Sequence, residues 1–151
     1  MRTLATLCAV ATITNLSLAA QIEVTITNQS PANGVFLTPL WVGFHDGSFD
    51  SYNGGLSSQP GLERIAEDGD FSLLSQDFLA GLTYIDSMGA SATVPSGQSP
   101  SELVDGAIAN GGPIAPGESA SSVFDLDLSG PNRYLSYVSM VLPSNDYYVA
   151  N

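Results

Sequence analysis

The fold is indicated most clearly by residues 134–146, which read YLSYVSMVLPSND. The part from Tyr134 to Leu142 is apolar on both of its alternating faces, as is typical of a strand at the centre of a sheet. Pro143 has no backbone N–H to donate to a sheet ladder, so it marks the end of that strand. Asn145 and Asp146 are residue types that tolerate tight turns. The segment therefore predicts a central strand that delivers one carboxylate at its end.

The carboxylate of Asp146 is a candidate metal ligand. A side chain at a strand-to-loop junction suits a hard cation, because the strand fixes its position and the loop exposes it. The alternative is a turn aspartate whose oxygens accept hydrogen bonds from nearby backbone N–H groups, and the spacing alone leaves both interpretations open. Tyr147 and Tyr148 follow directly and are candidate contacts for a partner.

Other segments show the alternation of half-buried antiparallel strands. Residues 21–27 and 120–128 alternate apolar and polar positions. Residues 35–44 are a further strand candidate, with an interruption at Pro39 that indicates an edge or a bulge. Residues 28–34 form a turn cluster that also contains a glycosylation sequon, NQS, followed by proline. Short strands separated by turns are typical of a β-sandwich.

Helical patterns are confined to the middle of the chain. Residues 60–68 predict a short helix ended by Gly69, and residues 71–79 predict a second one that Asp70 can cap. Residues 81–116 carry much glycine, serine and proline and predict surface loops with one brief strand. The predicted fold class is all-β: an antiparallel β-sandwich with one or two short helical inserts.

The amino terminus has the pattern of a secretory signal peptide over residues 1–19, with Arg2 ahead of a short apolar region and a small-x-small cleavage site. The predicted mature domain is residues 20–151, in an extracellular or periplasmic location. Cys8 is the single cysteine and would leave with the signal. An exported domain without disulfides must depend on core burial or on bound metal.

The charge balance excludes some partners. All fifteen acidic side chains lie after the predicted signal, against Arg64 and Arg133 and no lysine, a difference of thirteen. Nucleic-acid binding needs a basic surface, which this chain lacks, and no second apolar stretch is long enough for membrane insertion. Three interpretations of the acidic excess stay open: attraction of divalent cations, contact with a basic partner, and solubility.

His45, Asp46 and Asp50 form a second candidate group, in a loop that could contact a partner. Neighbouring residues of one loop seldom reach the geometry of a catalytic triad, and the chain has no Gly-x-Ser-x-Gly elbow. No catalytic residue is therefore assigned, and His45 is expected to hold the chain by hydrogen bonds. Trp41 lies inside a predicted strand and is expected in the core.

Three blocks in order resemble the spondin domain, the module of F-spondin, mindin and single-domain exported bacterial proteins. They are HDGSFD at 45–50, the PGLE helix leading to AEDG at 60–69, and the strand ending in PSND at 134–146. The resemblance covers most of residues 21–151 and implies a C2-like sandwich with calcium at one end, Asp146 being a ligand. The family's other carboxylate ligands fall in a later turn. The resemblance therefore also implies that the family's C-terminal segment is lacking here. That would leave the calcium site incomplete and strand 134–142 partly unpaired.

The function expected from this sequence is that of a secreted, non-enzymatic binding or adhesion module. The resemblance implies calcium-assisted contact with extracellular matrix or cell-surface partners, through a protein or glycan ligand. Two alternatives stay open: a secreted hydrolase that uses loop carboxylates, and a purely structural matrix component.

Overall fold

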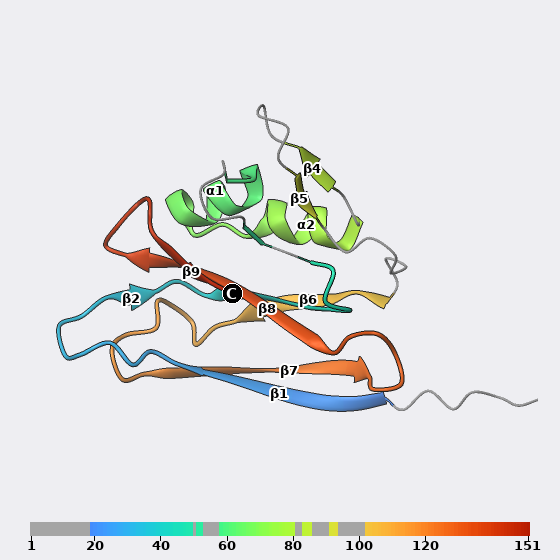
Figure 1. Cartoon of the computed structure of the whole chain (residues 1–151). Helices are drawn as coiled ribbons and strands as arrows, with labels where there is room; N and C mark the ends of the chain where they lie inside the picture. The colour runs from blue at the N-terminus through green and yellow to red at the C-terminus, as the bar shows by residue number, and fades with distance from the viewer. Residues whose placement is uncertain (1–18, 50, 53–57, 81–82, 86–90, 94–101) are drawn as a thin grey trace, which may run out of the picture.

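The computed structural model describes residues 19–49, 51–52, 58–80, 83–85, 91–93 and 102–151. The strands are β1 (Ala19–Thr27), β2 (Phe36–Leu37), β3 (Leu40–His45), β4 (Thr83–Ile85), β5 (Ser91–Thr93), β6 (Val104–Ile108), β7 (Ser119–Asp127), β8 (Tyr134–Leu142) and β9 (Tyr148–Ala150), and the helices are α1 (Pro60–Asp68) and α2 (Ser72–Ala80). The central sheet lies between the helices on one face and the β1–β7 pair on the other (Figure 1). This confirms the all-β sandwich with two short helical inserts.

Strand β8 is the central strand, as its sequence predicts. It pairs with β2 and β3 on one edge and with β9 on the other, all antiparallel. Beyond β9 the side chain of Asn151 continues the ladder, since its Oδ1 accepts from the Tyr137 N–H at 2.8 Å and its Nδ2 donates to the Leu135 carbonyl at 3.0 Å. The expectation of a partly unpaired strand was therefore wrong over residues 135–141, because residues 148–151 fold back along it.

The break predicted at Pro39 separates β2 from β3. Here Thr38 continues the ladder with both its side chain and its backbone. Its Oγ1 accepts from the Met140 N–H at 3.1 Å, and its backbone N–H donates to the Met140 carbonyl at 3.1 Å. The buried Ser139 hydroxyl donates to the Thr38 carbonyl at 2.9 Å. These bonds keep the backbone satisfied where the proline removes a donor.

The core lies on both faces of the central sheet, because β3 is buried along its whole length. Trp41 is fully buried on the helix side and confirms the core prediction. The helix-side cluster is Trp41, Phe49, Leu62, Ile65, Leu74, Phe78, Leu103, Val138 and Met140. The cluster between the sheets is Leu40, Val42, Phe44, Ile108, Ile114, Ala120, Phe124 and Leu126.

Helix α1 has the predicted bounds. Gly69 adopts a left-handed φ of 68°, and its N–H closes the last turn on the Ile65 carbonyl at 2.9 Å. Gly61 allows α2 to approach closely, because a Cβ there would lie 2.9 Å from the backbone Cα of Leu74.

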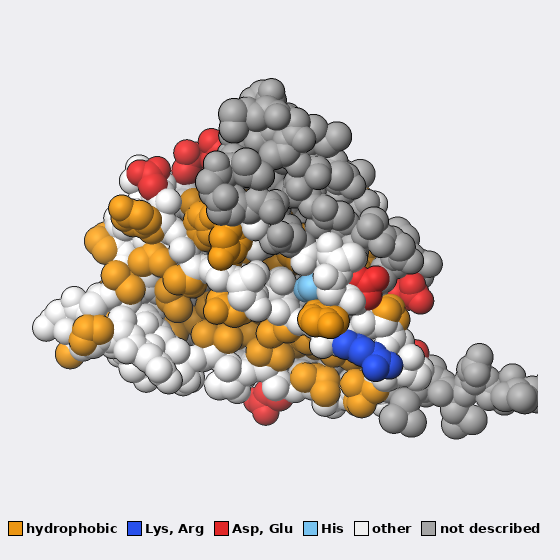
Figure 2. All heavy atoms as spheres, viewed as in Figure 1, with side chains coloured by type: hydrophobic (Ala, Val, Ile, Leu, Met, Phe, Trp, Pro, Cys, Tyr) orange, Lys and Arg blue, Asp and Glu red, His pale blue; other side chains and the backbone are white. Residues whose placement is uncertain are grey.

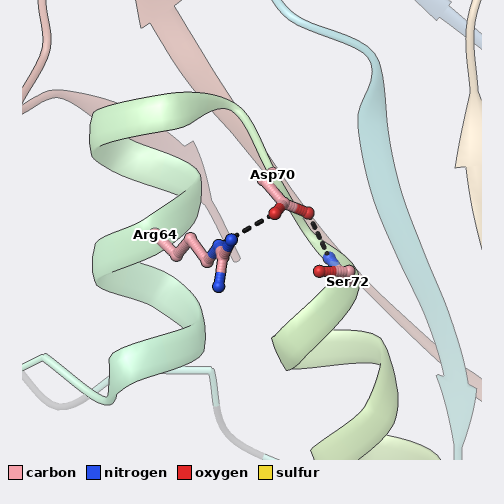
Figure 3. Close-up of polar contacts among 3 residues, drawn as sticks. All are labelled: Arg64, Asp70 and Ser72. Atoms are coloured by element: carbon pink, nitrogen blue, oxygen red, sulfur yellow. Dashed lines mark hydrogen bonds and ion pairs between the residues drawn. The ribbon is translucent and has the colours of Figure 1, made fainter.

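Helix α2 begins one residue later than predicted, at Ser72. Asp70 nevertheless serves its start, since its Oδ1 accepts from the Ser72 N–H at 2.9 Å (Figure 3). Its other oxygen lies 2.8 Å from Arg64 Nε of α1. Hydrogen bonds from the backbone and the side chain of Ser72 lower the pKa of Asp70 below its ordinary value, and the Arg64 charge makes a smaller contribution in the same direction.

The prediction of surface loops over residues 81–116 was wrong at β6, which pairs with β3 as part of the central sheet. Asp105 and Gly106 interrupt its apolar pattern, so the alternation is hard to read in the sequence. Strand β6 also adjoins β7, where the Ser122 hydroxyl donates to the Ala107 carbonyl at 2.7 Å. The predicted brief strand falls on β5, which pairs with β4.

The predicted signal peptide falls on residues that lie, up to residue 18, outside the described part of the chain. Among the described residues, no helix combines the length and the apolar character that crossing a membrane requires.

Candidate functional site

Asp146 lies in the tight turn that joins β8 to β9, and its side chain is exposed. The Val141 N–H donates to the Tyr147 carbonyl at 2.8 Å across the base of this turn. Within it, the Asp146 N–H donates to Ser144 Oγ at 3.1 Å. The backbone of Asp146 is thus held by the sheet while its carboxylate points to solvent, as the strand-to-loop junction predicts.

Asp146 and two further carboxylates line an open hollow of about 350 Å³. Glu63 and Glu67 of α1 line the hollow together with Ser58, Ala66 and Tyr148. The two glutamates are four residues apart, so they share one face of the helix. Three acidic side chains from two distant parts of the chain therefore converge on one concave surface.

The two tyrosines next to Asp146 have different environments. Tyr147 is 70% exposed, so it offers a large amphipathic surface next to Asp146 in the chain. Tyr148 lines the hollow and packs against the helix-side core, with its ring 6.2 Å from that of Tyr52. Burial, and then the neighbouring Tyr52, raise the pKa of Tyr148 above its ordinary value. Tyr147 is thus the more accessible contact residue.

His45 and Asp46 lie at the other end of β8, because His45 pairs with Tyr134, the first residue of that strand. A nine-residue strand is about 26 Å long at 3.3 Å per residue, so the two candidate groups are well separated. Asp50 lies outside the described residues. The predicted site residues thus fall into two places: Asp146, Tyr147 and Tyr148 at one end, and His45 with Asp46 at the other.

His45 is a structural residue in this geometry, as the sequence predicts. It is 4% exposed, its Nδ1 accepts from the Gly47 N–H at 3.0 Å, and its Nε2 lies 3.1 Å from Ser136 Oγ. Since Nδ1 is an acceptor, Nε2 carries the proton and donates to Ser136. The neighbouring Asp46 accepts from the Ser48 hydroxyl and N–H, and these bonds lower its pKa.

Stability is expected to fall as the pH drops below 6.5, because burial lowers the pKa of His45 from that ordinary value and the Asp46 charge opposes the shift only in part. In that pH range His45 binds a proton in the unfolded chain but stays neutral in the folded chain. The loss continues down to the folded pKa, with a slope of at most about 1.4 kcal/mol per pH unit. The free energy of unfolding in urea at pH 8, 6.5 and 5 measures this effect.

The matched variant is His45→Asn, which keeps an acceptor for the Gly47 N–H and cannot titrate in this range. Its free energy of unfolding is expected to change less between pH 6.5 and 5 than that of the parent chain. An NMR titration in which the imidazole of the folded chain protonates at or above pH 6.5 would contradict the prediction.

A second acidic hollow, of about 240 Å³, lies near the end of β7. It is lined by Glu102, Asp125, Asp127 and Asn132, and by three apolar or glycine positions. In neither hollow do three or more carboxylate, histidine or cysteine side chains of the described residues come close enough to hold a metal ion as they stand.

Sequence reasoning did not associate Glu63 and Glu67 with Asp146. The sequence does contain one indication of this acidic surface: the two glutamates stand at positions i and i+4 on the polar face of a predicted helix. Their position over the end of β8 depends on how α1 packs on the sheet, which no local pattern encodes.

Comparison with known proteins adds no relative: no family model matches the chain, and neither the curated proteins nor the solved structures contain a match. Membership of the spondin family therefore stays a prediction from the three sequence blocks.

Proposed function

We propose that this protein is a secreted, non-enzymatic binding module that makes calcium-assisted contact with an extracellular protein or glycan partner. The observation that supports the proposal is the convergence of Asp146, Glu63 and Glu67 on one open hollow, next to the exposed Tyr147. An acidic concave surface raises the local concentration of cations. The exposed ring beside it offers a partner an apolar face and a hydroxyl.

The donor chemistry of the hollow suits calcium. Carboxylate oxygens and the Ser58 hydroxyl are hard ligands, and calcium takes six to eight of them. The three carboxylates are not close enough together to provide a complete set of ligands. Asp146 would therefore hold the ion with Glu63 or Glu67, and water or a partner would supply the remaining oxygens. When bound, the ion would neutralise the hollow and link it to an acidic or hydroxylated group of the partner.

Calcium is expected to raise the melting temperature of the full chain through this hollow. For a site of the weak extracellular class, with a Kd of about 10⁻⁴–10⁻³ M, a tenfold excess of calcium adds about 1.4 kcal/mol. That corresponds to a shift of about 4 °C in a domain of this size. Asp146→Asn removes the charge at nearly constant volume and is expected to abolish most of the shift. Differential scanning calorimetry with 10 mM calcium or with a chelator measures it.

The control is Asp125→Asn in the second acidic hollow, which is expected to keep the full calcium shift. If this variant loses the shift and Asp146→Asn keeps it, the cation binds elsewhere and the proposed site is wrong. Glycosidase turnover by the purified chain that survives chelation would instead favour the hydrolase alternative over a binding module.

A further inference from the structure

The sandwich is closed on one side and open on the other. On the closed side β6 adjoins β7 through the Ser122 hydroxyl and the Ala107 carbonyl. On the open side, β1 and β9 each have one edge without a strand partner among the described residues. Figure 2 shows hydrophobic side chains gathered on this face, over β2, β8 and β9 and near the right-hand end of β1. The open side therefore combines unpaired backbone with exposed apolar surface.

A hollow of about 330 Å³ lies between the sheets on the open side. Its lining comes from Ile26 and its two threonine neighbours in β1, and from Leu37, Leu40, Tyr137 and Val149 of the central sheet. None of these side chains is charged. Val149 is 37% exposed and lies on the face of β9 opposite Tyr148, so this hollow is separate from the one at Asp146.

The backbone of β1 is aligned for a further strand. The Asn28 N–H donates to the Glu118 carbonyl and the Asn28 carbonyl accepts from the Gly117 N–H, so even-numbered residues bond toward β7. In an antiparallel ladder the odd-numbered residues, Gln21 to Thr27, then direct their N–H and C=O groups to the open edge. Another extended backbone matches this two-residue spacing.

The edge lacks the usual features that prevent strand addition. Strand β1 is nine residues long, with no proline, no lysine and no bulge in its pairing with β7. Its one charged residue is Glu23, which lies opposite Val123 and forms no ion pair with a described residue. An incoming strand with a basic residue beside Glu23 would complete a cross-strand pair.

We propose that this open side binds an extended segment of another protein, antiparallel to β1, with apolar side chains entering the hollow and basic side chains facing Glu23. The acidic excess of the chain favours a basic segment from another protein. The two arginines among the described residues do not lie in a strand, since Arg64 belongs to α1 and Arg133 precedes β8. The hollow lies between two sheets, so it admits a single strand more readily than a second folded copy. The proposal is independent of the calcium site.

The test uses a labelled octapeptide of alternating valine and lysine, with binding followed by fluorescence anisotropy at physiological salt. In antiparallel pairing the lysine amides face β1, because residues that share hydrogen bonds share a face. N-methylation of the lysine amides is expected to weaken binding at least tenfold, and N-methylation of the valine amides less than threefold. This part of the test changes only the peptide. A scrambled peptide that binds equally well would overturn the proposal, and so would equal losses of affinity from the two methylations.

Two protein variants with the same charge change localise the site. Val149→Lys places a cation in the hollow and is expected to weaken binding at least tenfold. Leu79→Lys is the control, because Leu79 is also 37% exposed but lies on α2, on the other face of the central sheet, and it is expected to weaken binding less than threefold. Equal losses of affinity in the two variants would mean that the peptide binds through general charge attraction, and would overturn the proposed site. A dimer of the chain, seen by ultracentrifugation, that Val149→Lys dissociates and Leu79→Lys leaves intact would assign the edge to a second copy and overturn the choice of partner.

Discussion

Replacing Trp41 with alanine is expected to lower the free energy of unfolding by about 3–5 kcal/mol. The side chain is fully buried, with its ring 5.6 Å from Phe49 and 5.2 Å from Phe78. Its Nε1 donates to Asp105 Oδ2 at 2.9 Å, so the same substitution removes a donor from a partly buried carboxylate. A domain of this size has a total stability of about 5–15 kcal/mol, so the variant would retain only part of it.

The measurement is urea denaturation followed by far-ultraviolet circular dichroism, because the variant has no tryptophan fluorescence. Trp41→Phe is the matched control: it refills most of the volume and cannot donate to Asp105, which Ser75 also contacts. Its expected loss is about 1–3 kcal/mol, mainly the cost of a carboxylate with one donor fewer. An alanine variant that loses less than about 1 kcal/mol would show that this part of the core is loosely packed.

Replacing Asn28 with alanine is expected to cost about 2–5 kcal/mol, which is large for a polar residue. Its Nδ2 donates to the Val35 carbonyl at 2.8 Å and to the Ile114 carbonyl at 2.9 Å. Its Oδ1 accepts from the N–H and the hydroxyl of Ser30, and the side chain is 4% exposed. Alanine would leave two carbonyl oxygens without this donor at the point where β1, the following turn and the segment before β7 meet.

Asn28→Asp is the more specific probe, because it keeps the shape and the acceptors but turns a carboxylate toward the same two carbonyl oxygens. It is expected to cost at least as much as alanine at neutral pH. The exposed Asn110→Ala is the control and is expected to stay within about 0.5 kcal/mol of the parent chain. Urea midpoints that are the same for all three variants would contradict this role. The contacts also argue against a glycan on the NQS sequon, since attachment would remove one of the two amide donors.

Elements with a strict local pattern could be predicted closely. Strand β8 has the bounds read from its apolar run, α1 has those set by Pro60 and Gly69, and β1 alternates as its sequence indicates. Strand β6 was missed, because Asp105 occupies a position at which pattern reading expects an apolar side chain. That carboxylate is tolerated where Trp41 and Ser75 donate to it, and both donors come from elements distant in the sequence.

The candidate site divides along the same line. The local pattern is enough to predict that Asp146 follows a central strand and is exposed, because proline ends the ladder and the turn residues after it face water. Tertiary packing alone brings Glu63 and Glu67 to the hollow that Asp146 lines and places His45 a strand length away. It also leaves one side of the sandwich open at β1. Local patterns report which face of an element is buried, whereas the position of one element over another depends on how their side chains pack.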